Sequence, residues 1–303
     1  MQDSWSLTTY RPAGAAADSL AAAVRRSDGR LVVPEELRPY QGLAAALDDW
    51  EALAPRLHNL DPAGLIVVEG EELLPIRFPR KLLCVGANYR DHLAEMGVDT
   101  VPEGWQPYFF LKAPTTTLIG DGDDIVIPDD PAFRVDWEAE LAVVIGRGGR
   151  DIPLDEALEH VAGYACFNDV TARALLRREV SIAPPFGFDW STSKGLDTFA
   201  PLGAMTPSWL VEDPGALAVR CIVNGEIKQD GTTANLITGI AEVIAAASSH
   251  WTLEPGDVIA TGTPAGTGAG RGEQLAEGDL VEVEIPGFAP LRNRVRVRVP
   301  QTR

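Results

Sequence analysis

This sequence has few cysteines and no long apolar run, and each shortage excludes a class of protein. Its three cysteines, Cys84, Cys166 and Cys221, are widely spaced and form no Cys-X-X-Cys pair, so we expect buried free thiols rather than a disulfide framework. No apolar run approaches the roughly 18 residues of a membrane span. The first residues lack the basic start and apolar stretch of a signal peptide. The sequence thus predicts a cytoplasmic protein without a membrane partner.

Positive charge is also in short supply. The 303 residues include 26 lysines and arginines against 44 aspartates and glutamates, a net charge of −18. So large a negative charge argues against nucleic acid as a partner, and an anionic substrate would need a metal or a few well-placed cations to receive it. Only four of the 26 are lysines, whereas 22 are arginines. A lysine kept where arginine is the rule is a candidate for a compact site charge, which singles out Lys112 and Lys194.

The order of apolar and turn residues indicates two parts. At 303 residues the chain is long for a single domain, and 45% of it is hydrophobic, which is enough for sizeable cores. Up to residue 78, leucine and tryptophan recur at helical spacing between short strand-like runs. From residue 79, Gly-Asp pairs lead into short apolar strands. We therefore predict a small N-terminal α/β region over 1–78 and a second domain, which carries the chemistry, over 79–303.

Strands outnumber helices in the second part. The pattern predicts strands at 82–85, 125–127, 258–260 and 280–283, and helices at 154–161 and 236–250. Because the two kinds do not alternate regularly, we expect an α+β fold with a mixed, largely antiparallel sheet rather than a doubly wound one. A glycine-rich stretch at 262–270 lacks the Gly-Lys-Ser/Thr of a nucleotide-binding loop, and we expect it to lead into another strand.

Two glutamates stand on an otherwise apolar strand. In a strand over 136–146, Glu138 and Glu140 share one face, with Cα atoms roughly 7 Å apart, while leucine, valine and isoleucine fill the other face. Two such carboxylates repel each other and lose hydration, and a cation between them removes both penalties. Oxygen ligands without a nearby cysteine or histidine favour Mg²⁺, Mn²⁺ or Ca²⁺ over zinc. The alternative is an edge strand whose glutamates face water.

Two further motifs carry ionisable groups. Asp169 follows the apolar strand that begins at residue 163, where it adds a third carboxylate or, alternatively, caps a turn. His92 and Glu95 are three residues apart, so on a helix they share a face and can hydrogen-bond. A carboxylate beside an imidazole fixes its tautomer and raises its basicity, as a base that activates water requires. A surface pair without function is the alternative.

Seven motifs occur in an order that resembles the fumarylacetoacetate hydrolase family, in its smaller bacterial-type branch of acylpyruvate hydrolases and 2-hydroxyhepta-2,4-diene-1,7-dioate isomerases. The resemblance spans about residues 80 to 297. The motifs are Cys-Val-Gly-Ala-Asn-Tyr at 84–89 with His92 and Glu95, Phe-Leu-Lys-Ala-Pro at 110–114, Glu-Ala-Glu-Leu at 138–141, Asn-Asp-Val-Thr-Ala-Arg at 168–173, Ser-Lys-Gly-Leu-Asp-Thr-Phe at 193–199, Val-Asn-Gly-Glu at 223–226 and Gly-Asp-Val-Ile-Ala-Thr-Gly-Thr-Pro at 256–264.

The resemblance implies a metal site, a base and a fold. It implies that Glu138, Glu140 and Asp169 bind a divalent ion, Mg²⁺ or Mn²⁺, with Ca²⁺ as a third candidate. It implies that His92 and Glu95 lie on a mobile segment and together activate water. The implied fold is a β-roll with flanking helices behind a small N-terminal domain, and the implied assembly is a homodimer.

The remaining matched residues concern the substrate, an oxo acid or a dicarbonyl compound. The resemblance implies that Lys194 adds positive charge where negative charge develops, and that Thr263 receives a substrate carboxylate or oxo group. Arg90 and Lys112 would contact the substrate or support groups that do. One substrate position departs from the family, because Leu176 stands where many members carry a glutamine. A substrate oxygen held there would lose its partner, at about 1–3 kcal/mol, so the pocket is expected to be more apolar.

These parts predict an enzyme that hydrolyses a C–C bond. The substrate would be a 2,4-dioxo acid of the acylpyruvate type or a related 1,3-dicarbonyl compound, cleaved through a metal-bound enolate. Two alternatives use the same site: a decarboxylase of the oxaloacetate type, and an isomerase or dehydratase that makes the enolate without adding water. A non-catalytic binding protein that has kept the metal cradle is a further alternative, which Leu176 alone supports.

Overall fold

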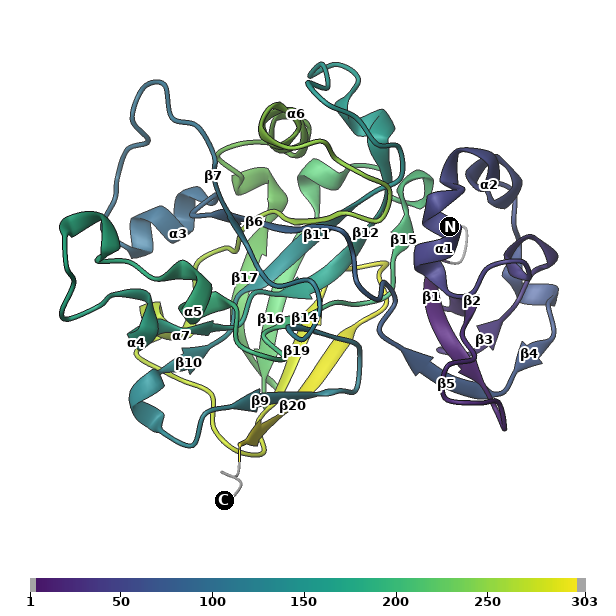
Figure 1. The fold of residues 1–303 in the computed structure, drawn as a ribbon, viewed down its shortest axis with the longest axis horizontal. Helices are drawn as coiled ribbons and strands as arrows, with labels where there is room; N and C mark the ends of the chain where they lie inside the picture. The colour runs from purple at the N-terminus through teal and green to yellow at the C-terminus, as the bar shows by residue number, and fades with distance from the viewer. Residues whose placement is uncertain (1–3, 299–303) are drawn as a thin grey trace.

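The computed structural model describes residues 4–298 and consists of a small N-terminal part beside a larger body (Figure 1). The small part holds a five-stranded antiparallel sheet of order β4-β3-β2-β1-β5, covered by two helices. The leucines at helical spacing belong to these two helices, which are separated at Asp49. The elements are β1 (Trp5–Pro12), β2 (Ala21–Arg26), β3 (Leu31–Val32), α1 (Leu43–Asp48), α2 (Trp50–Leu57), β4 (Val67–Val68) and β5 (Gly70–Leu73).

A six-stranded sheet runs through the middle of the body, in the order β15-β12-β11-β18-β6-β7. All its neighbours are antiparallel except β18 and β6, which run parallel. Valine, isoleucine, tyrosine and phenylalanine are interspersed with small residues along β11 and β12, and every residue of both strands is buried. The strands are β6 (Leu82–Gly86), β7 (Tyr108–Leu111), β11 (Ala139–Ile145), β12 (Val161–Asn168), β15 (Thr206–Pro207) and β18 (Val258–Ala260).

A second, five-stranded sheet of order β17-β16-β19-β20-β9 packs against the first. Two short pairs, β10 with β13 and β8 with β14, complete the sheets. The remaining strands are β8 (Leu118–Ile119), β9 (Asp124–Ile127), β10 (Val135–Asp136), β13 (Thr171–Ala172), β14 (Ala200–Pro201), β16 (Ala218–Val223), β17 (Glu226–Thr232), β19 (Leu280–Glu284) and β20 (Leu291–Val297). The remaining helices are α3 (Arg90–Glu95), α4 (Arg173–Leu176), α5 (Trp190–Lys194), α6 (Ile240–His250) and α7 (Gly268–Arg271). This arrangement confirms the predicted α+β fold, a largely antiparallel β-roll with flanking helices.

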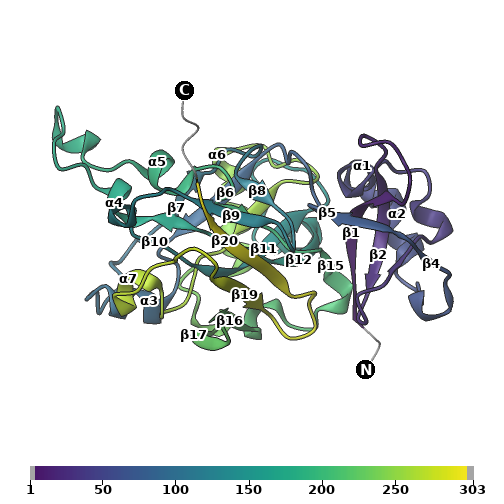
Figure 2. The ribbon, with the colours of Figure 1, turned by 90° about the horizontal axis from the view of Figure 1, so that it is seen from below.

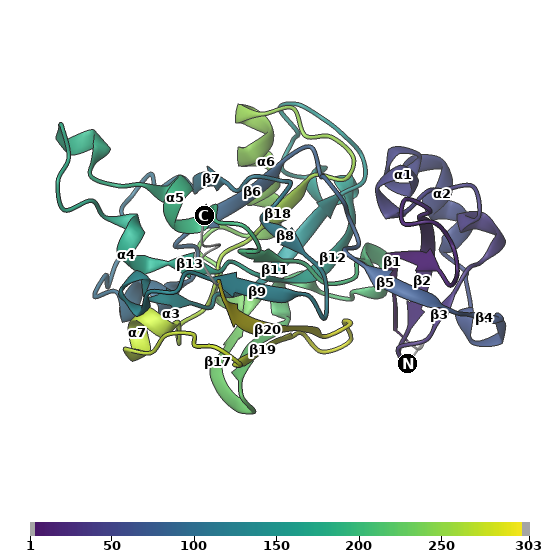
Figure 3. The same cartoon turned by 60° about the horizontal axis from the view of Figure 1, so that its bottom comes forward.

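The two faces of the six-stranded sheet have different partners. On β11, Leu141 and Val143 point into a core shared with the second sheet and α6. The alternate residues, Ala142 and Val144, point into a core shared with the N-terminal part. The contact with that part is close, because an added Cβ at Gly146 would lie only 2.7 Å from Trp50 Nε1. Figures 2 and 3 show the N-terminal part beside this end of the sheet.

Three local predictions were wrong. The predicted helix at 154–161 is a turn and a short 3₁₀ helix at Ala157–His160, because the His160 carbonyl accepts the amides of Gly146 and Arg147 and Val161 begins β12. The helix predicted from residue 236 begins at Ile240, because Asn88 holds the amides of residues 237 and 238. The glycine-rich stretch leads into the single turn of α7 rather than directly into a strand.

The three cysteines are free thiols, as the sequence predicted. Cys84, Cys166 and Cys221 are all free and buried, and burial raises the pKa of each thiol. Within residues 4–298, no helix is long and apolar enough to cross a membrane.

Candidate metal centre and active site

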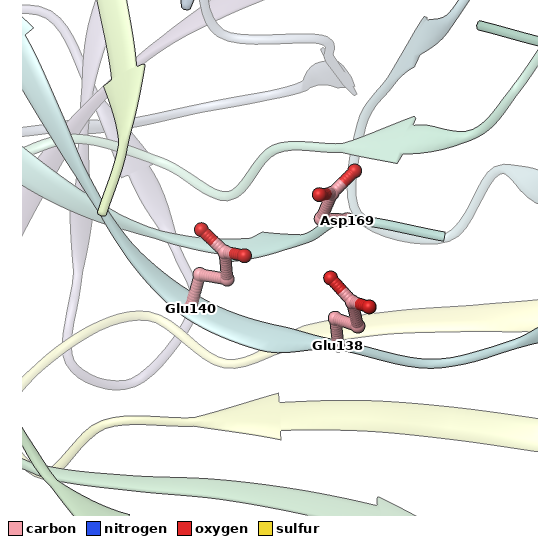
Figure 4. A group of neighbouring side chains, drawn as sticks. All are labelled: Glu138, Glu140 and Asp169. Carbon is pink, nitrogen blue, oxygen red and sulfur yellow. The ribbon is translucent and has the colours of Figure 1, made fainter. Parts of the chain in front are cut away.

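Three buried carboxylates converge at one end of the central strands. Glu138 immediately precedes β11, Glu140 lies within it, and Asp169 follows β12. The register pairs Ala139 with Asn168 and Glu140 with Phe167, which brings the three side chains to the same place. One carboxylate oxygen from each lies within 4.8 Å of the others (Figure 4). Two residues of one strand segment and a third that lies 29 positions beyond Glu140 thus supply one set of oxygen ligands.

The alternation of β11 explains why the carboxylates share a face. Glu138 and Glu140 occupy the same parity as Ala142 and Val144, whose face the N-terminal part covers. Leu141 and Val143 take the opposite parity and enter the other core. The same face of the sheet therefore carries the carboxylates at one end and the N-terminal part at the other.

Three cationic side chains surround the carboxylates. Lys194 Nζ lies 2.6 Å from Glu138 Oε2 and 2.7 Å from Asp169 Oδ2. Lys112 Nζ lies 2.5 Å from Asp169 Oδ1. Arg173 donates to Glu138 Oε1 as well. Burial raises the pKa of Glu138, but Lys194 and Arg173 lower it by more, so this carboxyl stays ionised.

Among the described residues, Glu140 forms no ion pair. Its Oε2 accepts the amide of Gly262 at 2.7 Å. Burial, together with repulsion from Asp169 and Glu138, holds the pKa of Glu140 well above its usual range. Asp169 Oδ1 is buried and accepts no hydrogen bond of good geometry from the described residues, although the positive charge of Lys112 lies beside it. Both features are those of ligands that fit a hard cation.

The charge balance points the same way. When all are ionised, the three clustered carboxylates and the adjacent Asp136 face the three cations of Lys112, Arg173 and Lys194, which leaves one negative charge. A divalent ion would turn this into one positive charge inside a protein of net charge −18. Because an isolated positive centre attracts anions, the residues present fit a divalent ion and an anionic ligand together.

The predicted imidazole–carboxylate pair is assembled next to the carboxylates. His92 Nδ1 lies 2.9 Å from Glu95 Oε2, both on α3, and the His92 side chain is largely buried. Glu95 is itself held by the amide of Gly266 at 2.9 Å and by the Thr267 hydroxyl at 3.2 Å. The same segment of the chain contacts the carboxylates, because the Gly262 amide donates to Glu140 Oε2 and the Gly266 amide donates to Glu95.

The residues predicted to bind substrate lie in different environments. The Thr263 hydroxyl donates to the Ala139 carbonyl and accepts from Gln229, so its proton is already committed. Lys112 is wholly buried and donates to the carbonyls of Val170 and Phe199 besides pairing with Asp169. Lys112 supports the carboxylate cluster by its contact with Asp169, and it has almost no exposed surface that a substrate could contact.

Two other predicted substrate contacts lie farther out. Arg90 is exposed and lines a cavity between the 101–107 loop and α6. Leu176 is half-buried at the end of α4, and its carbonyl accepts the amide of Asp189 across a connection that projects from the body (Figures 2 and 3). That connection leads to α5, where Trp190 stands one turn before Lys194. The Lys194 ammonium lies 5.3 Å from the Phe110 ring, which in turn packs on Trp190.

Sequence reasoning missed three residues that hold the site together. Arg173 and Asp136 form a buried pair beside Glu138. Gln229 accepts the Ala139 amide and donates to Thr263 and Pro264, each at 2.8 Å. Arg173 stands four residues after Asp169 in a motif, which is a signal that was available. Gln229 lies on β17 with no motif around it, and no local pattern singles it out.

Comparisons with known proteins place this geometry in context. The sequence profile described as fumarylacetoacetate (FAA) hydrolase C-terminal matches residues 81–296. A mitochondrial oxaloacetate tautomerase of Xenopus laevis is 40% identical over 226 residues, covering 74% of this chain and 67% of that protein.

Two solved structures extend the likeness to almost the whole chain. Fumarylacetoacetate hydrolase from Exiguobacterium antarcticum aligns with a TM-score of 0.78 at 31% identity, covering 97% of this chain and 100% of that one. Maleylpyruvate hydrolase from Sphingobium sp. SYK-6, in complex with manganese(II) and pyruvate, aligns with a TM-score of 0.75 at 28% identity, with the same coverages of 97% and 100%. Hydrolases and a tautomerase thus share this fold.

Proposed function

Because this chain belongs to the fumarylacetoacetate hydrolase family, a family of enzymes, we propose that it hydrolyses a C–C bond in a 2,4-dioxo acid of the acylpyruvate type or a related 1,3-dicarbonyl compound. One observation carries the proposal: a histidine already paired with a glutamate, His92 with Glu95 at 2.9 Å, stands beside three converging buried carboxylates. The first group suits a base for water, and the second suits a divalent ion. The hydrolase with bound manganese(II) and pyruvate supports the divalent ion and an oxo-acid ligand.

Glu138, Glu140 and Asp169 would hold the ion. Mg²⁺ or Mn²⁺ is the candidate, with Ca²⁺ third, and the bound ion supplies Lewis acidity toward the carbonyl oxygens of the substrate. The protein's own contribution is to keep the three oxygens together. Lys112 and Arg173 do this by pairing with Asp169 and Glu138 from the sides.

His92 is oriented to act as a base. Because an ionised carboxylate only accepts hydrogen bonds, Glu95 holds the proton of His92 on Nδ1 and leaves Nε2 with its lone pair. Nε2 takes a proton from water, and the hydroxide adds to the carbonyl carbon distal to the carboxylate. The C–C bond then breaks, its electron pair stays with the pyruvate-type fragment, and the proton on His92 passes to that fragment. The products are a carboxylic acid and a methyl ketone such as pyruvate.

Lys194 supplies a fixed positive charge during this reaction. Burial lowers the pKa of Lys194, but Asp169 and Glu138 raise it by more, so the side chain stays an ammonium ion. It therefore stabilises negative charge that develops on the departing fragment and takes no proton itself.

The second candidate function does not use water as a reactant. It is either proton transfer, as in an oxaloacetate tautomerase, or decarboxylation. The 40% identity to an oxaloacetate tautomerase favours it. The same His92–Glu95 pair would then move a proton between oxygen and carbon.

Product analysis separates the two candidates. The protein is incubated with acetylpyruvate, a longer acylpyruvate and oxaloacetate, each with Mg²⁺ or Mn²⁺, and products are followed by proton NMR. Hydrolysis releases one carboxylic acid for each pyruvate. Faster enol–keto interconversion of oxaloacetate than in buffer alone, or release of CO₂, without acid from any 2,4-dioxo acid would contradict the hydrolase and support the second candidate.

A further inference from the structure

One short loop contacts both the His92–Glu95 pair and the carboxylate cluster. At its first end, the Glu95 carboxylate accepts the Gly266 amide at 2.9 Å and the Thr267 hydroxyl at 3.2 Å. Thr267 also caps α7, because its hydroxyl oxygen accepts the amide of Gly270. The loop over 266–270 therefore sets where Glu95, and with it His92, can lie.

At its second end the loop reaches a metal ligand through two charged residues. The amide of Ala269 donates to Asp136 Oδ2 at 2.6 Å. Asp136 Oδ1 accepts from Arg173 Nε at 2.9 Å, and the other side of the Arg173 guanidinium donates to Glu138. Asp136 and Arg173 are both largely buried, so these charge-assisted bonds are shielded from water.

The loop has little room to absorb a displacement. A Cβ at Gly268 would lie 2.8 Å from the Glu273 carbonyl and 3.1 Å from Asp136 Oδ2, and one at Gly270 would overlap the Glu95 carboxylate. Trp137 donates its indole N–H to the Gly266 carbonyl at 3.1 Å. Because close-packed groups shift together, a movement at one end of the loop is felt at the other.

We infer that Asp136 and Arg173 are positioning residues that couple the docking of Glu95 to the orientation of Glu138. The inference rests on the proposed function only in taking Glu138 as a metal ligand. A metal ion that fixes Glu138 would thereby stabilise the docked α3, and docking of α3 would strengthen metal binding by the same factor, since coupling between two sites is reciprocal. The base would then be placed for reaction only when the metal site is complete.

Hydrogen exchange and metal titration on the full chain test this without any substrate. In the wild type, saturating Mn²⁺ should slow amide exchange in peptides that cover residues 90–97. In Asp136→Asn, which weakens the bonds to Arg173 and Ala269, that slowing should disappear. Its Mn²⁺ affinity, measured by calorimetry, should fall about 10- to 100-fold, the usual effect of losing a residue that orients a ligand.

Matched variants keep the test decisive if Asp136→Asn folds poorly. Thr267→Val removes the hydroxyl that contacts Glu95 and caps α7, and should still lower Mn²⁺ affinity several-fold. Thr267→Ser keeps the hydroxyl and should restore the wild-type affinity. Arg271→Ala, at the end of α7, serves as the control and should change neither measurement, because its ion pairs among the described residues are with Glu226 and Glu273.

Two results would overturn the coupling. One is that Mn²⁺ protects residues 90–97 equally in the wild type and in Asp136→Asn. The other is that Thr267→Val binds Mn²⁺ as tightly as Thr267→Ser. Loss of C–C hydrolysis with this coupling intact would instead count against the proposed function alone, so the two failures can be told apart.

Discussion

The Lys194 ammonium lies 2.6 Å from Glu138 Oε2, a carboxylate oxygen of the proposed metal site. An ammonium ion in direct contact with a metal-binding carboxylate competes with the metal ion for the lone pairs of that carboxylate. At the proposed metal site, Lys194 would weaken the binding of the ion, while it would add the positive charge that an anionic substrate needs. Lys194 would therefore have opposite effects on metal affinity and on activity, and the two can be measured separately.

Replacing Lys194 by methionine should lower activity without lowering metal affinity. The variant keeps the length of the side chain but removes the charge that stabilises the departing fragment, so kcat should fall about 10²- to 10³-fold. Mn²⁺ affinity should stay the same or rise, because a like charge has left the site. Kinetics at saturating Mn²⁺ and calorimetry measure the two effects. A variant that lost Mn²⁺ binding would show that Lys194 supports the ligands instead.

Removing the carboxylate of Glu140 should abolish both metal binding and activity while leaving the fold intact. Glu140→Gln keeps an oxygen for the Gly262 amide but cannot ligate as an anion. Since burial and two neighbouring carboxylates disfavour its charge, the metal-free variant should unfold at the same temperature as the metal-free wild type or higher.

Chelation provides the companion measurement. Wild-type protein treated with a chelator should lose turnover and regain it with Mg²⁺ or Mn²⁺. Full turnover by protein freed of metal would contradict the metal-dependent reaction.

The His92–Glu95 pair should matter for hydrolysis more than for metal binding. His92→Ala removes the base and should slow C–C hydrolysis about 10²-fold or more, while Mn²⁺ still binds. Glu95→Gln should slow it comparably, because an amide no longer fixes the imidazole tautomer. Steady-state kinetics with an acylpyruvate measures both. Wild-type hydrolysis by His92→Ala would move the tautomerase or decarboxylase to first place.

Leu176 should set the preference for substrate polarity. Leu176→Gln supplies a hydrogen-bonding group on the short α4, next to the connection that leads to Lys194. It should raise kcat/KM for small polar substrates such as acetylpyruvate, on the scale of the roughly 1–3 kcal/mol that an unpaired polar group costs. Leu176→Met, similar in size and apolar, is the control. Equal kcat/KM values for the two variants would show that residue 176 does not contact the substrate.

The packing between the N-terminal part and the central sheet can be tested through Gly146. Gly146→Ala places a methyl group 2.9 Å from the Ala162 Cβ and inside the Trp50 ring, and should destabilise the protein by about 1–3 kcal/mol. Gly64→Ala adds the same group where no heavy atom lies within 4 Å, and should change stability little. Urea denaturation of both variants gives the comparison. Equal midpoints would mean that the N-terminal part moves aside freely.

Part of the site could be predicted from the sequence, because its signals are local. The alternation of β11 places Glu138 and Glu140 on one face whatever the rest of the chain does. The spacing of His92 and Glu95 allows their hydrogen bond on a single helical turn. The order of the seven motifs then identified the family, and with it the α+β fold.

Tertiary structure decided the rest, because the contacts concerned join distant segments. Glu95 meets Gly266 across 171 positions, and Asp136 meets Ala269 across 133. No periodicity of 2 or 3.6 residues encodes such distances. The starts of α6 and β12 depended on Asn88 and on the His160 carbonyl for the same reason. The sequence by itself determined which ionisable groups are candidates for the site, whereas only the folded chain decided which neighbours hold them, because burial and charge pairing are properties of residues brought together in space.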